Sequence, residues 1–238
     1  METLAGKLAI VTGGTRGIGR AIAERLLQEG CHVAICGRNQ ATVDAAVAEM
    51  HQLGTIVGIA ADVTQPSQVE HFFSEVDRQF GGLDILVNNA GEGVFRKVGE
   101  MTVDDWRRNI DLNLNGAFYC AHAALSRFAK RGGGFIVNIS SLAAKNAFSG
   151  GAGYNASKFG LNGFTEALML DHRYDNVRVC SVMPGSVATD FSGDAKPAAD
   201  TGWKVAVQDV AEVVSMVLRM PARTMVSQVE MRPSKPKK

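Results

Sequence analysis

The stretch KLAIVTGGTRGIG, residues 7–19, joins a short apolar run to a turn rich in glycine. Gly13, Gly17 and Gly19 lie between this expected strand and an amphipathic segment that we expect to be helical from about residue 18 to 29. Glycines in such a turn let the backbone approach a pyrophosphate, and the helix N-terminus supplies free N–H groups with a partial positive charge. The spacing is GxxxGxG and not the general GxGxxG, but the strand–turn–helix context predicts a dinucleotide site.

The rest of the chain repeats this alternation of apolar runs and amphipathic segments. We expect further strands over residues 32–36, 55–63, 83–89, 135–140, 177–183 and 228–232. The helices between them are expected over residues 41–53, 66–80, 102–130, 154–173 and 209–219. Near-continuous apolar strands separated by helices predict a parallel sheet covered on both faces. The sequence therefore predicts an α/β protein with a doubly wound Rossmann fold and a seven-stranded parallel sheet.

The composition of the 238 residues is that of an ordinary globular protein, with 46% hydrophobic and 21% charged residues. The formal net charge of +1 argues against a nucleic-acid surface. No apolar run reaches the length of a membrane span, and the N-terminus lacks the pattern of a secretory leader. We therefore expect a cytoplasmic protein with no nucleic-acid or membrane partner. Residues 1–233 are expected to form one domain, followed by a basic tail, 234–238.

The cysteines, at positions 31, 36, 120 and 180, form no CxxC pair and have no zinc-ligand spacing. Cys36 and Cys180 lie inside apolar runs, where a free thiol behaves as a small core residue. We interpret the cysteines as structural thiols and expect no metal.

Residues that follow the strands are candidates for ligand contacts, because ligands of a doubly wound sheet bind beyond the carboxyl ends of the strands. After the second strand, where a carboxylate would bind the ribose of NAD, the chain has Arg38. An arginine binds a 2′-phosphate through charge-assisted hydrogen bonds, and Arg16 adds a second positive charge. Both favour NADP(H), although Arg38 is also compatible with an ordinary surface arginine. Asp62 is a candidate acceptor for the adenine amino group, and Asn88 and Asn89 either tie strand ends together or line a cofactor site.

Tyr154 and Lys158 lie four residues apart in the segment GYNASKFG, 153–160, and therefore share a helix face. A tyrosine also packs well on a buried helix face, so the pair alone leaves simple packing as an alternative. A phenol with its ordinary pKa of about 10 is a poor acid–base catalyst at neutral pH. Because a nearby ammonium stabilises the phenolate, we expect Lys158 to lower the pKa of Tyr154. Asn113 in a helix interior is unfavourable unless its amide is hydrogen-bonded.

Six features, in register over about residues 5–220, resemble the short-chain dehydrogenase/reductase family: TGGTRGIG, NNAG, Asn113, Ser141, YNASK and the PG at 184–185. The resemblance implies a catalytic tetrad of Asn113, Ser141, Tyr154 and Lys158. It implies that Tyr154 donates a proton to the substrate oxygen as hydride reaches the carbon, while Ser141 holds that oxygen. Lys158 would also bind the nicotinamide ribose, and Asn113 would hold a water that links Lys158 to solvent. The cofactor-binding set is expected to be Gly13, Thr15, Arg16, Gly17, Ile18, Gly19, Arg38, Asp62, Val63, Asn89, Ala90, Gly91, Tyr154, Lys158, Pro184, Gly185, Val187 and Thr189.

The resemblance also implies a homo-oligomer and a substrate lid over residues 186–207. The chain ends in SQVEMRPSKPKK, unlike the glycine-rich end of many relatives, so a dimer is an alternative to a tetramer. Four aromatic residues either line an apolar pocket or simply pack: Phe95, Phe148, Phe191 and Trp203.

We therefore expect an NADP(H)-dependent oxidoreductase that transfers hydride between nicotinamide and a small-molecule carbonyl or alcohol. A 3-oxoacyl-thioester reductase is one form of such an enzyme. The alternative is a non-catalytic NADP(H)-binding sensor or interaction module on the same fold, against which the complete tetrad argues.

Overall fold

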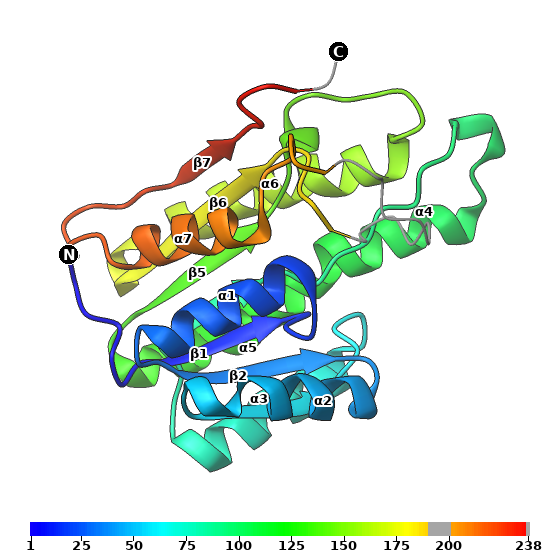
Figure 1. Cartoon of the computed structure of the whole chain (residues 1–238). Coiled ribbons are helices and arrows are strands. Elements are labelled where there is room, and N and C mark those ends of the chain that lie inside the picture. Colours follow the sequence, from blue (N-terminus) through cyan, green and yellow to red (C-terminus); the bar gives the residue numbers. More distant parts are fainter. Residues whose placement is uncertain (190–200, 237–238) are drawn as a thin grey trace.

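The strand that precedes the glycine turn, β1 (Leu8–Thr12), is completely buried and lies inside a parallel sheet (Figure 1). The computed structural model describes residues 1–189 and 201–236. The strand order is β3-β2-β1-β4-β5-β6-β7 and every pair is parallel. The other strands are β2 (His32–Gly37), β3 (Ile56–Ala60), β4 (Ile85–Asn88), β5 (Gly134–Ile139), β6 (Val177–Pro184) and β7 (Gln228–Met231).

Helices cover both faces of the sheet: α1 (Gly17–Gln28), α2 (Gln40–Met50), α3 (Pro66–Phe80), α4 (Val103–Ile110), α5 (Gly116–Arg131), α6 (Ala152–His172) and α7 (Val207–Leu218). Successive residues of β1 point to opposite faces, as a pleated strand requires. Ala9 and Val11 pack in one core with α1, α2 and α7, whereas Leu8 and Ile10 pack in a second core with α3 and α5. The predicted doubly wound Rossmann fold is confirmed. No helix within the described ranges is both long and apolar enough to cross a bilayer.

The predicted helix over 102–130 is wrong in one respect, because it consists of two α-helices separated by a π turn. The turn spans Asp111–Asn115, and the N–H of Gly116 donates to the carbonyl of Asp111, five residues earlier. A capping box starts the first helix: Thr102 Oγ1 accepts from the N–H of Asp105, and Asp105 Oδ2 accepts from the N–H of Thr102. The π turn displaces the chain by one residue relative to a continuous helix.

Helix α7 begins earlier than the sequence predicted. Asp209 was expected to be the N-cap, but the helix begins at Val207. Asp209 lies in its first turn and accepts a hydrogen bond of 3.0 Å from the N–H of Ala206. A carboxylate serves either position because it accepts hydrogen bonds from the unpaired N–H groups at a helix start.

Candidate active site

The glycine turn closes tightly between β1 and α1. Gly13 and Gly17 have φ values of +63° and +55°, in the left-handed region that favours glycine. A Cβ on Gly19 would lie 2.3 Å from the Gly13 carbonyl oxygen, so no larger residue fits there without a shift. The turn therefore leaves a short backbone cradle at the N-terminus of α1, where N–H groups and the helix dipole favour an anion.

The two asparagines after β4 tie strand ends together, which is one of the two alternatives predicted for their side chains. Asn89 Nδ2 donates to the carbonyl groups of Thr12 (2.9 Å) and Gly13 (3.2 Å). Thr12 Oγ1 accepts from the N–H groups of Asn89 and Ala90, both at 3.0 Å. Asn88 Nδ2 donates to Asn138 Oδ1 at 2.9 Å. Asn89 thus fixes the glycine turn.

Two arginines flank this turn. Arg38, after β2, and Arg16, in the turn, are exposed. Neither guanidinium forms an ion pair or hydrogen bond with another described residue. A Cβ on Gly37 would lie 3.1 Å from Thr15 Cγ2, so the end of β2 lies against the turn. The two cations are therefore available for an anionic ligand beside the glycine cradle.

The ends of β3 and β6 contribute the remaining candidate contacts. Asp62 Oδ1 accepts hydrogen bonds from the N–H (2.9 Å) and hydroxyl (2.8 Å) of Thr64, which fix its carboxylate. After β6, the N–H of Gly185 donates to the Met231 carbonyl at 2.8 Å. A Cβ on Gly17 would lie 3.6 Å from Thr189 Cγ2, so the chain after β6 reaches the glycine turn.

The remaining members of the predicted cofactor set lie on the same segments. Ile18, in the first turn of α1, packs against the core, Val63 is buried after β3, and Ala90 and Gly91 follow β4. Pro184 ends β6, and Val187 pairs with Val205. The predicted lid, 186–207, lies partly outside the described residues, as do Phe191 and the last two residues of the basic tail.

Tyr154 lies in the first turn of α6 and is hydrogen-bonded to Ser141 at the end of β5. Ser141 Oγ also accepts from the N–H of Ala143 at 3.1 Å. Only 8% of Tyr154 is exposed. Burial raises the pKa of Tyr154, and the hydrogen bond to Ser141 opposes that change.

Lys158 is buried one turn later on the same helix. Its Nζ donates to the Ile139 carbonyl at 3.0 Å and lies 5.8 Å from the Tyr154 ring centroid. Burial lowers the pKa of Lys158 to about 8. The expected lowering of the Tyr154 pKa is therefore wrong for the protein without a bound cofactor, because burial raises this pKa. Both groups are buried, and burial disfavours the charged form of each.

Asn113 lies in the π turn and is fully hydrogen-bonded, as the sequence required. Its Nδ2 donates to the Glu92 carbonyl (2.9 Å) and to Ser157 Oγ (3.0 Å). Its Oδ1 accepts from the N–H of Glu92 at 3.0 Å. The side chain therefore joins the loop after β4 to α6, directly beside Lys158.

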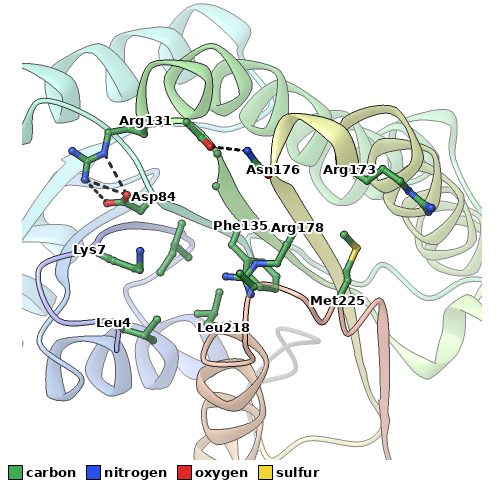
Figure 2. Close-up of a pocket in the computed structure, with 15 residues that line it drawn as sticks. Leu4, Lys7, Asp84, Arg131, Phe135, Arg173, Asn176, Arg178, Leu218 and Met225 are labelled. Carbon is green, nitrogen blue, oxygen red and sulfur yellow. Dashed lines mark hydrogen bonds and ion pairs between the residues drawn. The ribbon is translucent and has the colours of Figure 1, made fainter. Parts of the chain in front are cut away.

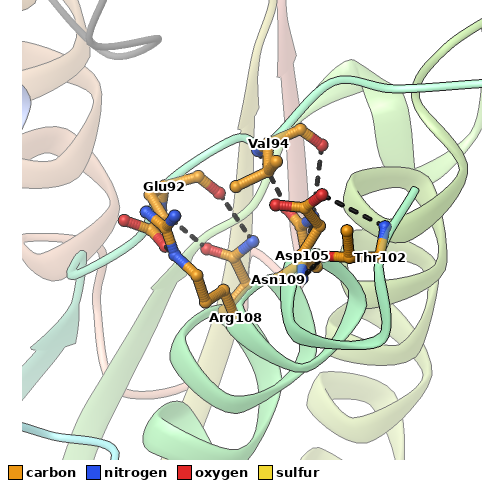
Figure 3. Close-up of polar contacts among 7 residues, drawn as sticks. Glu92, Val94, Thr102, Asp105, Arg108 and Asn109 are labelled. Carbon is orange, nitrogen blue, oxygen red and sulfur yellow. Dashed lines mark hydrogen bonds and ion pairs between the residues drawn. The ribbon is translucent and has the colours of Figure 1, made fainter. Parts of the chain in front are cut away.

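Asn109 is a buried residue of this site that the sequence analysis missed. Its Oδ1 accepts from the N–H of Val94 and its Nδ2 donates to the Val94 carbonyl, both at 3.2 Å (Figure 3). A Cβ on Gly153 would lie 2.9 Å from Asn109 Nδ2, so Asn109 also touches the start of α6. The available signal was a second asparagine in a helix interior, four residues before Asn113.

Two of the four predicted aromatic residues meet at Tyr154. The Phe95 ring centroid lies 5.7 Å from that of Phe148 and 5.5 Å from that of Tyr154. Trp203 instead lies with its ring 5.9 Å from Lys204 Nζ.

A hollow of about 360 Å³ lies at the opposite end of the strands (Figure 2). Its charged groups are largely paired with protein: Arg131 binds Asp84, and the Arg178 guanidinium lies 4.7 Å from the centroid of Phe135. The catalytic candidates are not among the residues that line it. We therefore place the candidate site at the carboxyl ends of the strands and not in this hollow.

The four cysteines are buried and unpaired. Burial raises the pKa of Cys31, Cys36 and Cys180 to about 12. A thiol with so high a pKa is a poor nucleophile, which agrees with a structural role.

Comparison with known proteins gives consistent matches over most of the chain. Residues 7–200 match the short chain dehydrogenase family. An uncharacterised oxidoreductase of Staphylococcus aureus (strain MRSA252) is 32% identical over 98% of this chain and 100% of that protein. A 3alpha-hydroxysteroid dehydrogenase of Mediterraneibacter gnavus is 38% identical over 79% of this chain and 76% of that protein.

Two solved structures are similar throughout. An alcohol dehydrogenase of the archaeon Thermococcus sibiricus, complexed with 5-hydroxy-NADP, has a TM-score of 0.90 and 27% identity, covering 98% of this chain and 99% of that one. A metagenomic short-chain oxidoreductase in complex with NADP has a TM-score of 0.86 and 32% identity, covering 99% of this chain and 100% of that one. With the family match over residues 7–200, these likenesses show that the chain belongs to the short-chain dehydrogenase/reductase family and is an oxidoreductase of that family.

Proposed function

We propose that this protein transfers hydride between NADP(H) and a small-molecule carbonyl or alcohol, with Tyr154 as the general acid or base. The observation that carries the proposal is the hydrogen bond between Tyr154 and Ser141 beside the buried Lys158. The relatives named alcohol dehydrogenase and hydroxysteroid dehydrogenase support an alcohol or carbonyl as the reacting group.

The residues at the strand ends fit NADP(H). The cradle formed by Gly13 and Gly19 has no room for a Cβ at position 19, and it would receive the pyrophosphate at the N-terminus of α1. Arg38 and Arg16 would bind the 2′-phosphate, and Asp62 the adenine amino group. The other members of the predicted cofactor set lie on the same strand ends. NADPH, when bound, supplies the hydride.

Residues of the protein would transfer the proton that the substrate oxygen receives during reduction. Ser141 Oγ holds the substrate oxygen, and Tyr154 donates its phenolic proton to that oxygen as the carbon is reduced. The raised pKa of Tyr154 keeps the phenol protonated and ready to donate in the reductive direction. A protonated Lys158 would stabilise the phenolate that results. The side chain of Asn113 is committed to Glu92 and Ser157, so its main-chain carbonyl would hold the proposed water.

Tyr154→Phe tests this proposal because it keeps the ring and removes the proton. Turnover of NADPH with a panel of ketones, aldehydes and a 3-oxoacyl thioester should fall by at least ~100-fold. The dissociation constant for NADPH should change little, and Tyr119→Phe on α5 serves as the matched control. Near-normal turnover would remove Tyr154 from its role. NADPH binding by the parent without turnover of any substrate would favour the non-catalytic sensor.

We further propose that the protein is a cytoplasmic homo-oligomer. Unpaired thiols suit a reducing compartment. Phe118 on α5 is exposed and packs edge-on against Phe164 of α6, and Phe159 and Leu170 of α6 are also exposed. A second copy would bury this apolar face. Sedimentation of the parent and of Phe118→Glu measures the assembly, and a parent that sediments as a monomer would contradict it.

A further inference from the structure

We propose that Phe95 and Phe148 form an aromatic wall that selects substrates carrying an apolar ring. This inference deepens the proposed function and rests on it. Because Phe95 contacts both Phe148 and Tyr154, at centroid distances of 5.7 Å and 5.5 Å, the three rings form one continuous group. That group ends at the proposed proton donor, so a ligand on the wall lies beside the reacting oxygen.

The two phenylalanines remain accessible although the phenol is buried. Phe95 is 38% exposed and Phe148 is 46% exposed, against 8% for Tyr154. Apolar side chains that stay open to solvent beside a few polar functional groups are typical of ligand sites. Aromatic side chains favour a ring over a linear chain, since edge-to-face and offset ring contacts add stabilisation beyond the area that they bury.

The loop that carries Phe95 is held rigidly by α4 (Figure 3). Asn109 binds both backbone groups of Val94, the residue before Phe95, at 3.2 Å. Arg108 forms an ion pair of 2.9 Å with Glu92 earlier in the same loop. Phe95 therefore extends from a backbone whose polar groups are fixed by a buried side chain.

The segment that carries Phe148 is held by α6. Asn155, the neighbour of Tyr154, donates from Nδ2 to the Ala143 carbonyl at 2.7 Å, and its Oδ1 accepts from the N–H of Phe148 at 3.4 Å. A Cβ on Gly151 would lie 2.6 Å from Phe148 Cε2, so the glycine lets this ring lie across the start of the helix. Residues 96 and 151 form a parallel bridge that joins the two segments. The wall is therefore pre-organised, which reduces the entropy lost on binding.

The test compares two probes that react at the same kind of carbonyl. 2-Tetralone carries an apolar bicyclic ring, and acetoacetyl-N-acetylcysteamine is a linear 3-oxoacyl thioester. Each is assayed with NADPH and the parent, Phe95→Ala, Phe148→Ala and, as a control, Tyr174→Ala, whose ring is 90% exposed elsewhere. Calorimetry measures the binding of 2-tetralone to the same proteins.

Each phenylalanine variant should lower kcat/KM for 2-tetralone by about tenfold, or ~1.4 kcal/mol, mainly through KM. The same variants should leave the thioester within about threefold, and Tyr174→Ala should change neither substrate. Equal losses of kcat/KM for both probes, or no loss with 2-tetralone, would contradict the proposed selection of ring substrates by Phe95 and Phe148. If the parent reduces neither probe but binds 2-tetralone in a manner that requires Phe95, the hydride-transfer proposal fails and the ring site stands. A parent that neither reduces nor binds 2-tetralone overturns the ring site.

Discussion

Arg38 is the single residue on which the proposed preference for NADPH over NADH most depends. Its guanidinium is exposed and forms no ion pair with another described residue, so a bound phosphate meets no competing carboxylate. Arg38→Asp replaces attraction with repulsion and supplies an acceptor for ribose hydroxyls. A charge-assisted hydrogen bond contributes about 1.5–3 kcal/mol. The dissociation constant for NADPH should therefore rise roughly tenfold to a hundredfold, and that for NADH should not rise.

Fluorescence titration with both cofactors measures this change. Arg107→Asp makes the same change of charge on α4, outside the proposed site, and should leave both constants unchanged. Arg16 retains part of the phosphate binding, so the switch is expected to be incomplete. An Arg38→Asp variant with unaltered preference would show that Arg38 is an ordinary surface arginine.

Sequence reasoning located single residues better than it predicted what their side chains contact. Ser141, Tyr154 and Lys158 are brought together as predicted because each follows or faces the end of β5. The predicted direction of the Tyr154 pKa shift was wrong, because the shift depends on burial by segments that are distant in the sequence. For Asn89 the sequence left two roles open, and the structure shows that its side chain holds the glycine turn, since Thr12 ends the neighbouring strand.

Helix α4 and the π turn act together as the support of the loop after β4. Asn109 and Asn113 lie four residues apart and bind Val94 and Glu92 through pairs of backbone hydrogen bonds. The helix thus presents two amides to the loop much as a neighbouring strand would. This arrangement places Phe95 beside Tyr154.

Asn109→Leu should loosen that loop without changing residues that touch the reacting atoms. It leaves the backbone groups of Val94 without their partners, at a cost of about 1–3 kcal/mol. KM for 2-tetralone should rise several-fold, while kcat changes less. Thr102→Ala is the matched control because it removes the cap of the same helix at a cost of about 1 kcal/mol. Unfolding curves and steady-state kinetics measure both variants. If Thr102→Ala raises KM as much as Asn109→Leu does, Asn109 has no positioning role beyond stability.

Element boundaries were predictable where a residue has one strong local effect. Pro66 begins α3, and Gly81, with a φ of +74°, ends it, as expected. The π turn was not predictable, because the segment DLNLNG fits a continuous helix and only the contacts of Asn113 with Glu92 and Ser157 distinguish the two. Those contacts come from other elements, and local propensity carries no information about them.

Across the whole molecule, the amino ends and the carboxyl ends of the parallel strands have different roles. The carboxyl ends gather the glycine turn, the Tyr154 group and two arginines that pair with no other described residue. At the amino ends, Arg131 and Asp84 pair with each other (Figure 2). Asp84 also accepts from the N–H of Leu8 at 2.8 Å. The ion pair at the amino ends stabilises the fold, whereas Arg16 and Arg38 at the carboxyl ends have no ion-pair partner among the described residues and are available for a ligand. This polarity follows from the parallel topology, which the sequence predicted from its alternating strands and helices.

The burial of Lys158 beside Tyr154 lowers the free energy of unfolding of the protein. Burial lowers its pKa from 10.5 to about 8, so the folded protein disfavours the ammonium. Between these two pH values the unfolded chain binds more protons than the folded one, and the free energy of unfolding should therefore rise with pH. At pH 7 the charge is present in both states, and its burial costs roughly 3 kcal/mol.

Lys158→Met should therefore be inactive yet more stable than the parent at pH 7. We expect a gain of roughly 1–3 kcal/mol, because a buried ion is replaced by an apolar side chain while one hydrogen bond to Ile139 is lost. The gain should shrink as the pH rises from about 8 and level off above 10.5, where the parent lysine becomes neutral in both states. Urea unfolding at pH 7 and pH 10 measures it, and Lys130→Met, at an exposed position on α5, should show no such dependence. A Lys158→Met variant less stable than the parent at pH 7 would mean that the ammonium is well accommodated where it lies. In that case Lys158 would be needed for activity without lowering the stability of the folded protein.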